Sequence, residues 1–394
     1  MGRRVVVVMI EPPLPFGSAA GRWYYVLLKG LVARGHEVTA FAANCREGDS
    51  AEAARWYSPT QLDLRCFPAV AKAGIHNKLQ TLRRPHSYVF SDALRTELDA
   101  ALRRRFDVLH CEQHWAGWLA MSHRPRTLLN VHYLYDIDLG PTPVTQLRDA
   151  LRVRRERQLL RCFPALGAVT NRLAAHLAQI APRSDVHTLP LVLDTSFYPF
   201  TERQRTTEVP PTVGLIGSFT WGPSYDAGRR LIDRLWPSIA ARVPRARLLI
   251  AGRSAAQLIA GRPCPHGVTV VEDMPDAIPC FMDIDVMLYA PARGSGAKVK
   301  VFEAFALGTP VVTTSDGVEG LDAIDGVHAG IGSDDADLVE RTVALLNNPA
   351  AAERQRVAAR QLIERHCDLA RAIDRVEAAH DALCRRAIPS VASR

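Results

Sequence analysis

The sequence lacks the features that mark membrane, secreted and zinc-binding proteins. Its 394 residues contain no run of about 18 apolar residues, so no membrane-spanning helix is expected. The short apolar run at residues 5–10 ends at Glu11, Pro12 and Pro13 without a small-residue cleavage site, which indicates a buried strand and not a signal peptide. The 8 cysteines are scattered without a Cys-x-x-Cys pair, which favours reduced thiols in a cytoplasmic protein.

Basic residues outnumber acidic residues, which gives the chain a formal net charge of +8. No zinc-finger spacing and no mixed aromatic and basic motif accompanies the arginines, so nucleic-acid binding is not favoured. A basic protein is equally expected where anionic diphosphates are bound. A hydrophobic content of 47% is ordinary for a folded protein, and the length allows two domains.

Strand and helix patterns alternate through both halves of the chain. In the first half we expect strands at residues 5–10, 37–42, 108–111, 127–131 and 168–170, and helices at 23–34 and 144–163. After a polar linker at 201–211 we expect strands at 212–217, 247–252, 268–271, 286–289 and 310–314, helices at 227–242, 299–306 and 335–347, and a helical tract at 350–386. The alternation predicts two doubly wound α/β domains with a cleft between them.

Residues 291–314 join a strand, a glycine turn and a helix. Gly294, Ser295 and Gly296 follow the strand at 286–289, where a glycine backbone can approach a ligand closely. The next helix presents free amides and its positive dipole end to this point, which favours phosphate. Lys298 could add a full positive charge, and Glu303 could accept hydrogen bonds from ribose hydroxyls. An ordinary turn with solvated lysines is the alternative.

This stretch resembles the signature of the retaining GT-B-fold nucleotide-sugar glycosyltransferases (family 4-like, glycosyl transferases group 1). That signature is a Glu-x7-Glu motif followed by Ala-x-Gly-x-Pro-Val-Val, and residues 303–312 (Glu-Ala-Phe-Ala-Leu-Gly-Thr-Pro-Val-Val) are similar to its second half. Ser295 stands at the first glutamate, so recognition of the donor sugar is expected to differ. Residues 294–300 are similar to a sub-branch pattern, Gly-Gly-x-Arg-Leu-Lys, in which Lys298 replaces the arginine as the main diphosphate candidate.

The resemblance extends in the family's order over nearly the whole chain. Residues 15–18 stand where the family has a glycine-rich loop facing the donor phosphates, and residues 217–224 resemble a loop of the donor domain without its usual Arg and Lys. Residues 249–253 and 271–276 match segments near the nucleotide and its base. The resemblance thus implies donor-binding residues at Gly17, Gly217, Ser218, Arg253, Met274, Ser295, Gly296, Ala297 and Glu303.

Two clusters of polar residues at strand ends carry the remaining site predictions. His132 follows the strand at 127–131, where relatives carry a histidine near the donor sugar, and we predict that it is catalytic together with Lys298. His110, Glu112 and His114 are predicted to bind the acceptor, with a structural role as the alternative. The His-x3-His spacing also suggests a metal, but no third ligand is evident and the resemblance implies no metal or other cofactor.

The resemblance implies an α/β protein with the GT-B fold, in which two doubly wound Rossmann-like domains face each other across a cleft. We place an acceptor-binding domain at 1–195, a nucleotide-sugar-binding domain at 196–370, and a helix at 371–394 that packs back onto the first domain. The basic helix at 144–163 could lie on a membrane surface, although a solvated helix is favoured, and the basic stretch 78–84 could contact the acceptor.

The implied reaction moves a sugar from a nucleotide-diphosphate sugar to a hydroxyl acceptor with retention of configuration. The acceptor could be a natural product such as an aminoglycoside, but polysaccharide and lipid-linked acceptors fit equally well. Two alternatives stay open, namely a GT-B-fold nucleotide-sugar epimerase or phosphorylase, and an inactive partner subunit that binds nucleotide sugar. The oligomeric state is not readable from the sequence.

Overall fold

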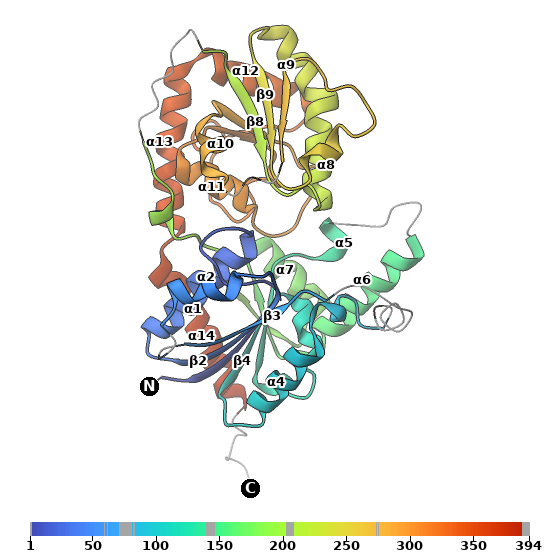
Figure 1. Cartoon of the computed structure of the whole chain (residues 1–394), viewed down its shortest axis with the longest axis vertical. Coiled ribbons are helices and arrows are strands. Elements are labelled where there is room, and N and C mark those ends of the chain that lie inside the picture. The colour runs from blue at the N-terminus through green and yellow to red at the C-terminus, as the bar shows by residue number, and fades with distance from the viewer. Residues whose placement is uncertain are drawn as a thin grey trace. The chain divides into compact units, whose positions relative to one another are not determined.

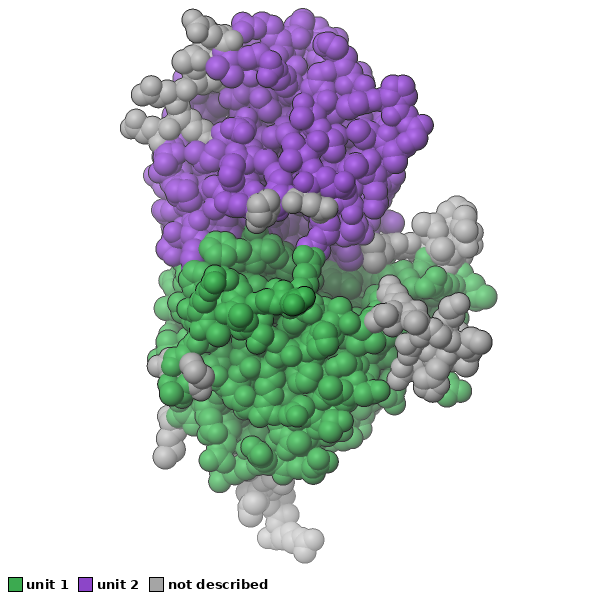
Figure 2. Space-filling view, in the orientation of Figure 1, with its two compact units in different colours: residues 1–136, 140–194, 368–394 green, residues 137–139, 195–367 purple. Residues whose placement is uncertain are grey.

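The chain folds into two compact units, shown in different colours in Figure 2. The computed structural model describes residues 2–58, 60, 62–70, 81, 83–138, 146–201, 209–272, 274 and 276–387. Unit 1 comprises residues 1–136, 140–194 and 368–394, and unit 2 comprises residues 137–139 and 195–367. Most of the predicted linker at 201–211, the end of the predicted C-terminal helix and part of the stretch 78–84 lie outside the described residues.

Unit 1 has a seven-stranded parallel sheet in the order β3-β2-β1-β4-β5-β6-β7 (Figure 1). Its strands are β1 (Arg4–Met9), β2 (Glu37–Cys45), β3 (Leu62–Pro68), β4 (Val108–Glu112), β5 (Thr127–Val131), β6 (Ala165–Ala168) and β7 (Asp185–Thr188). Its helices are α1 (Ala19–Ala33), α2 (Asp49–Trp56), α4 (Asp92–Leu102), α6 (Gln146–Leu160), α7 (Asn171–Ile180) and α14 (Leu369–Ala387), with short 3-10 turns at Ser87–Val89, His114–Trp118 and Arg124–Arg126. Strands β4 and β5 are buried along their whole length, as expected for a parallel sheet covered on both faces.

Unit 2 has a six-stranded parallel sheet in the order β10-β9-β8-β11-β12-β13. Its strands are β8 (Thr212–Ile216), β9 (Arg247–Ala251), β10 (Val268–Val271), β11 (Val286–Tyr289), β12 (Val311–Thr313) and β13 (Gly330–Ile331). Its helices are α8 (Gly222–Arg230), α9 (Trp236–Arg242), α10 (Ile278–Met282), α11 (Val299–Leu307), α12 (Asp335–Asn347) and α13 (Pro349–His366), with short turns at Thr195–Phe197 and Ala255–Leu258 and a π-helical turn at Leu231–Leu235. The short helix α5 (Tyr135–Asp138) ends in the segment 137–139, which groups with this unit.

Both sheets have the strand order of the Rossmann fold, since each grows first to one side of its first strand and then to the other. The reversal lies at β1 and β4 in unit 1 and at β8 and β11 in unit 2. In sheets of this kind, ligands bind beyond the carboxyl ends of the strands at the reversal. The loops after these four strands are therefore where each unit should bind its ligand.

Helix α14 returns the chain to unit 1 and packs along α1. Gly30 of α1 permits this approach, because a β-carbon there would lie 2.2 Å from Cγ1 of Ile373. Polar pairs join α14 to the start of the chain: Arg3–Asp381, Arg34–Asp374 and His36–Glu377. Beneath them, Nε2 of His380 lies 3.0 Å from Nδ1 of His110 on β4, and both rings are buried. The last helix of the chain thus completes the core of its first domain.

The buried His380 predicts that unit 1 loses stability in acid. Burial is the main cause that holds the pKa of His380 well below its usual value, and His110, Arg3, His36 and His187 lower it further. In the unfolded chain the imidazole regains a pKa of about 6.5, so the unfolded state binds more protons below that pH. The stabilisation is therefore complete above about pH 6.5 and is lost as the pH falls.

We expect denaturant unfolding to show a free energy of unfolding that falls with decreasing pH below about 6.5. The fall should be steeper in the wild type than in His380→Gln, by up to about 1.4 kcal/mol per pH unit. Equal slopes in the two proteins would contradict this prediction.

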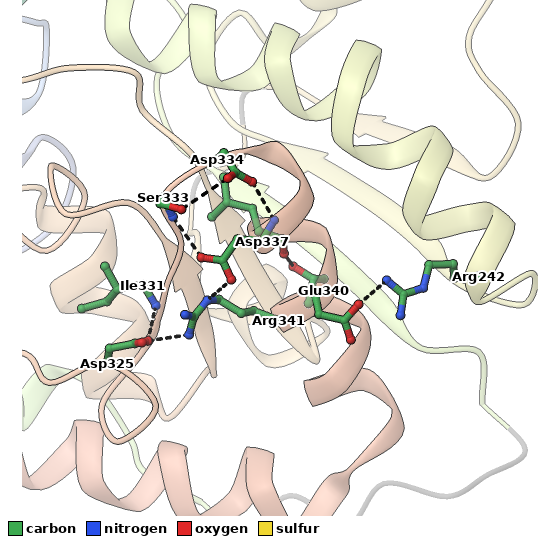
Figure 3. Close-up of polar contacts among 10 residues, drawn as sticks. Arg242, Asp325, Ile331, Ser333, Asp334, Asp337, Glu340 and Arg341 are labelled. Atoms are coloured by element: carbon green, nitrogen blue, oxygen red, sulfur yellow. Dashed lines mark hydrogen bonds and ion pairs between the residues drawn. The ribbon is translucent and has the colours of Figure 1, made fainter.

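Side chains tie helix α12 of unit 2 to the loop that precedes β13 (Figure 3). The N-cap Asp334 accepts a hydrogen bond from the Asp337 amide at 2.9 Å. Asp337 accepts from the guanidinium of Arg341 at 2.6 Å, and that guanidinium also lies 2.6 Å from Asp325. Asp325 accepts the Ile331 amide at 2.8 Å. The last strand of the sheet is thereby held against its covering helix.

The predicted strands at 127–131, 268–271 and 286–289 are confirmed, and the ends of most other elements differ by a few residues. The strand predicted at 168–170 was wrong in its position. It lies at Ala165–Ala168, because Thr170 caps α7 by accepting the Leu173 amide at 3.0 Å. The helix predicted at 227–242 begins earlier, at Gly222, and contains the π-helical turn.

Candidate active site

The loop after β9 contacts the loop after β8, which is one of the two strands at the reversal of the unit 2 sheet. A β-carbon on Gly252 would lie 2.0 Å from the carbonyl oxygen of Gly217, so only glycine allows this approach. The amide of Phe219 donates to the carbonyl of Arg253 at 2.9 Å. Beyond them, Met274 follows β10 and contacts the Cys280 thiol at 2.8 Å. The fold thus gathers four predicted donor-binding positions at this edge: Gly217, Ser218, Arg253 and Met274.

Two carboxylates face the glycine turn after β11. The amide of Ser295 donates to the carboxylate of Asp138, and the amide of Gly296 donates to Oε1 of Glu319 at 3.2 Å. Gly296 has a φ angle of 78°, which glycine adopts without strain. The Lys298 ammonium donates to the carbonyls of Ser295 and Gly296 at 3.2 and 2.6 Å. The backbone amides that precede α11 are therefore aimed at negatively charged oxygens, as in an anion-binding turn.

The pKa of the Asp138 carboxyl group lies well above the usual value of an aspartate. Burial raises its pKa to about 6, against the opposing influence of Lys298 and the Ser295 amide. The nearby charge of Glu319 raises this pKa further. Asp138 thus shares the turn with a second acidic group and can gain a proton just below neutral pH.

Lys300, on the first turn of α11, lies beneath the loop that follows β8. Its ammonium donates to the Ser224 hydroxyl at 2.7 Å and lies 4.2 Å from the ring centroid of Tyr289. A β-carbon on Gly217 would lie 3.0 Å from this ammonium. The Gly217 loop and Lys300 therefore form one site.

No carboxylate forms an ion pair with Lys300 in the part of the chain that the structure describes. Burial lowers the pKa of Lys300 to about 7, the charge of Lys298 lowers it further, and Glu303 opposes the shift. Glu303 itself is buried on α11. A desolvated lysine that lacks a carboxylate partner is prepared to receive an anion.

In unit 1 a buried carboxylate holds His132 in place. Oε2 of Glu112, at the end of β4, lies 2.5 Å from Nε2 of His132, which follows β5. Its Oε1 lies 3.0 Å from Nε2 of His110 and accepts the indole N–H of Trp23 at 3.0 Å. The amide of Asn130 donates to both oxygens, at 3.2 and 3.1 Å. Donors thus surround the carboxylate on all its lone pairs.

Glu112 keeps its charge although it is fully buried. Burial opposes the charged form, but hydrogen bonds from His110 and His132 outweigh it and hold the pKa of Glu112 below its usual value. The ionised carboxylate fixes the orientation of the His132 ring and requires a proton on its Nε2. Of the His132 side chain, 8% remains exposed.

The predicted acceptor-binding residues fall into two groups. His110 and Glu112 contact His132 or its partners, whereas Nε2 of His114 lies 2.9 Å from Glu156 of α6. All three are buried, which favours positioning roles, and direct contact with an acceptor stays a prediction. Gly17 lies in the exposed loop after β1 with a φ angle of 92°.

Three residues of this site were given no role by the sequence patterns. Lys300 stood inside the quoted stretch 294–300, where its lysine was a usable signal. Asp138 and Glu319 lie far from the glycine turn in sequence, and only the tertiary fold brings their carboxylates to its amides. No pattern of local spacing could have found these two residues.

The described residues contain neither a cluster of metal ligands nor a helix that could span a membrane. Within them, no three or more His, Cys, Asp or Glu side chains gather as metal ligands would. None of the described helices is both long and apolar enough to cross a membrane.

Solved structures with the same fold confirm the architecture. The chain is similar to sucrose-phosphate synthase from Thermosynechococcus elongatus, with a TM-score of 0.72, 16% identity, and coverage of 97% of this chain and 99% of that one. It is similar to Anabaena Alr3699/HepE, solved in complex with UDP-glucose, with a TM-score of 0.66, 11% identity and coverage of 96% and 99%. It is also similar to WaaG, a glycosyltransferase involved in lipopolysaccharide biosynthesis, with a TM-score of 0.62, 15% identity, and coverage of 96% of this chain and 99% of that one. The protein therefore has the GT-B fold, built from two Rossmann-like domains.

Family models match both halves of the chain. Residues 20–197 match Glycosyltransferase Family 4, and residues 210–348 match Glycosyl transferases group 1. No curated protein gave a significant match. The protein belongs to the group 1 glycosyltransferases, and it is a transferase enzyme.

Proposed function

We propose that the enzyme transfers a sugar from a nucleotide-diphosphate donor to a hydroxyl acceptor with retention of configuration. Lys300 carries the donor part of this proposal. It is a desolvated cation without a carboxylate partner among the described residues, and it lies at the reversal of the unit 2 sheet. A diphosphate would supply the missing negative charge.

The proposed chemistry breaks the bond between the sugar carbon C1 and the leaving phosphate oxygen. The acceptor oxygen forms the new bond to C1 on the same face, and its proton passes to the leaving phosphate. Lys298, Lys300 and the positive end of α11 stabilise the charge that develops on the diphosphate. This electrostatic term is the main source of rate in the proposal, and no metal is included.

Asp138 and Glu319 are proposed to take the place of the family's first glutamate, at which this chain has Ser295. Their carboxylates already accept the amides of the glycine turn. A sugar hydroxyl could donate to the same oxygens, because each carboxylate oxygen accepts more than one hydrogen bond. This supports donor-sugar recognition from residues outside the usual motif.

His132 is proposed to orient the acceptor hydroxyl, with Glu112 as its positioning residue. Glu112 takes up Nε2 of the ring, so Nδ1 is the atom left to meet a ligand. The contacts that hold Glu112 come from α1, β4 and β5 of unit 1. In this proposal, acceptor binding depends on the set of side chains that holds Glu112 and His132 in place, and not on His132 alone.

The donor proposal is tested by thermal denaturation with UDP, GDP and dTDP in parallel. UDP leads the panel because the Anabaena relative was solved with UDP-glucose. The preferred nucleotide should stabilise the protein by about 2.7 kcal/mol at a concentration 100-fold above its Kd. Stabilisation by none of the nucleotides would reject nucleotide-sugar binding.

The nucleotide sugar identified in this way then tests the reaction. NMR of the product should show the anomeric configuration of the donor, and an inverted product would overturn retention. Acceptors should include an aminoglycoside, a polysaccharide fragment and a lipid-linked sugar. An inactive partner subunit would bind the donor but neither hydrolyse nor transfer it, and an epimerase or phosphorylase would convert the donor without forming a new glycoside.

A further inference from the structure

A hollow in unit 1 collects three arginines around a tryptophan. It has a volume of about 320 Å³, which is at the small end of ligand pockets. Arg83 and Arg84 line it from one segment and Arg155 from α6, and Trp118 and Leu159 add an apolar surface. We call this place the arginine hollow. None of these residues belongs to the glycine turn of unit 2 or to the cluster around Glu112, although Arg83 and Arg84 end the basic stretch 78–84 that could contact the acceptor.

The arginines of the hollow have no acidic partners among the residues that the structure describes. No carboxylate forms an ion pair with Arg83, Arg84 or Arg155 among the residues covered by the structure, and the guanidinium of Arg155 donates to the neutral amide oxygen of Gln158 at 3.0 Å. Neighbouring arginines of α6 differ, since Arg152 pairs with Asp149 and Arg157 pairs with Asp136. Positive charge in the hollow is thus left uncompensated.

The positive charge of Arg84 affects the neighbouring Arg95. Burial is the main cause that lowers the pKa of Arg95, and the charge of Arg84 lowers it further. An anion in the hollow would relieve this repulsion between like charges. Guanidinium groups suit a phosphate because their N–H groups can bind two of its oxygens at once.

Trp118 indicates that the anionic group belongs to a ligand with an apolar organic part. Its indole N–H donates to the carbonyl of Pro85 at 3.1 Å, so the ring is fixed and its carbon surface is what it offers to the hollow. Leu159 adds to that apolar side. The ligand therefore needs a small organic body next to its negative group.

We propose that the arginine hollow binds a phosphate ester, with Arg83, Arg84 and Arg155 on the phosphate and Trp118 against the organic part. The proposal is independent of the donor site in unit 2. Two sources of this chemistry exist, a soluble phosphorylated molecule and the headgroup of an anionic lipid. Leu151 and Leu147, which lie one and two helical turns before Arg155 on α6, are exposed, so the test includes a lipid surface.

The experiment measures binding of glycerol 3-phosphate to the full chain by calorimetry. Lys298→Ala and Lys300→Ala are present in every protein, so that the proposed donor site does not contribute. The test variant is Arg84→Gln with Arg155→Gln, and the matched control is Arg148→Gln with Arg154→Gln, two exposed arginines of α6 that do not line the hollow. Both variants remove two positive charges from the same region.

We expect the test variant to weaken binding at least about tenfold and the control to weaken it by less than about twofold. Trp118→Phe should remove the change in tryptophan fluorescence on binding, while thermal denaturation confirms that each variant is folded. Vesicles of phosphatidylglycerol, compared with phosphatidylcholine, form the second arm. Binding of the soluble ester alone assigns a soluble ligand, and binding of the anionic vesicles alone assigns a headgroup, provided in each case that the test variant loses it. Equal weakening in both variants, or no binding in either arm, overturns the proposal.

Discussion

Replacing Lys300 with methionine is expected to lower turnover by about 100- to 1,000-fold, the effect of removing one preorganised group that stabilises transition-state charge. Methionine keeps much of the side-chain volume, so the packing against Tyr289 and Ser224 should survive. The matched control is Lys29→Met, which removes an exposed lysine of α1. Lys298→Met should also reduce turnover, because this lysine neighbours the same turn.

Lys300 also predicts proton uptake when the nucleotide binds. Its pKa of about 7 without ligand is raised by a bound diphosphate, because the anion favours the charged form. At about pH 8 most of the free enzyme carries a neutral Lys300 and should take up close to one proton per nucleotide. At about pH 6 the lysine is already charged and uptake should be small.

Calorimetry in buffers of different ionisation enthalpy measures this uptake directly. Affinity for the nucleotide should fall as the pH rises above about 7, by up to tenfold per pH unit. Lys300→Met should remove both the uptake and this part of the pH dependence. Wild-type turnover in this variant, or uptake that persists in it, would remove Lys300 from the diphosphate site.

Replacing Glu112 with glutamine is expected to lower kcat by about 100-fold without weakening nucleotide binding. Glutamine keeps one carbonyl oxygen but adds N–H donors where the carboxylate accepts from both His110 and His132. One histidine must then give up the proton on its Nε2. If this is His132, its Nδ1 carries the proton instead, and the ring presents the wrong atom to the acceptor.

A double-variant comparison separates this role from a general loss of structure. If Glu112 acts through His132, then Glu112→Gln together with His132→Asn should be no slower than His132→Asn alone. The acid limb of the pH profile should move in Glu112→Gln, while nucleotide affinity, which depends on unit 2, should stay unchanged. Additive losses in the double variant would instead indicate that Glu112 only supports the fold.

The sequence predicted the fold well because its strands are short, apolar and bounded by turn residues. The strand at 286–289 and the helix after Lys298 needed only the local pattern. Less apolar strands escaped notice. β7 (Asp185–Thr188) has no fully buried residue, and β3 (Leu62–Pro68) is half-exposed, so neither carries the continuous apolar run of an internal strand.

Only the part of the candidate site that is local in sequence could be predicted. Ser295, Gly296 and Lys298 lie together at the glycine turn because one stretch of chain carries all three, and their roles in binding stay predictions. Asp138 reaches that turn across 157 positions, and Lys300 is defined by its burial, which no sequence window displays. Glu112 was noticed as a strand-end acid, but the four side chains that donate to it come from separate strands and helices.

The return of α14 to unit 1 also governs the order in which the chain can mature. Residues 195–367 form an insertion within the first domain, which is completed only by residues 368–394. On the ribosome, unit 2 is fully synthesised while the groove around Gly30 and His110 still lacks its covering helix. Domains usually fold in order from the N-terminus. Here the N-terminal domain is synthesised first, but it can complete its fold only after unit 2 has been synthesised.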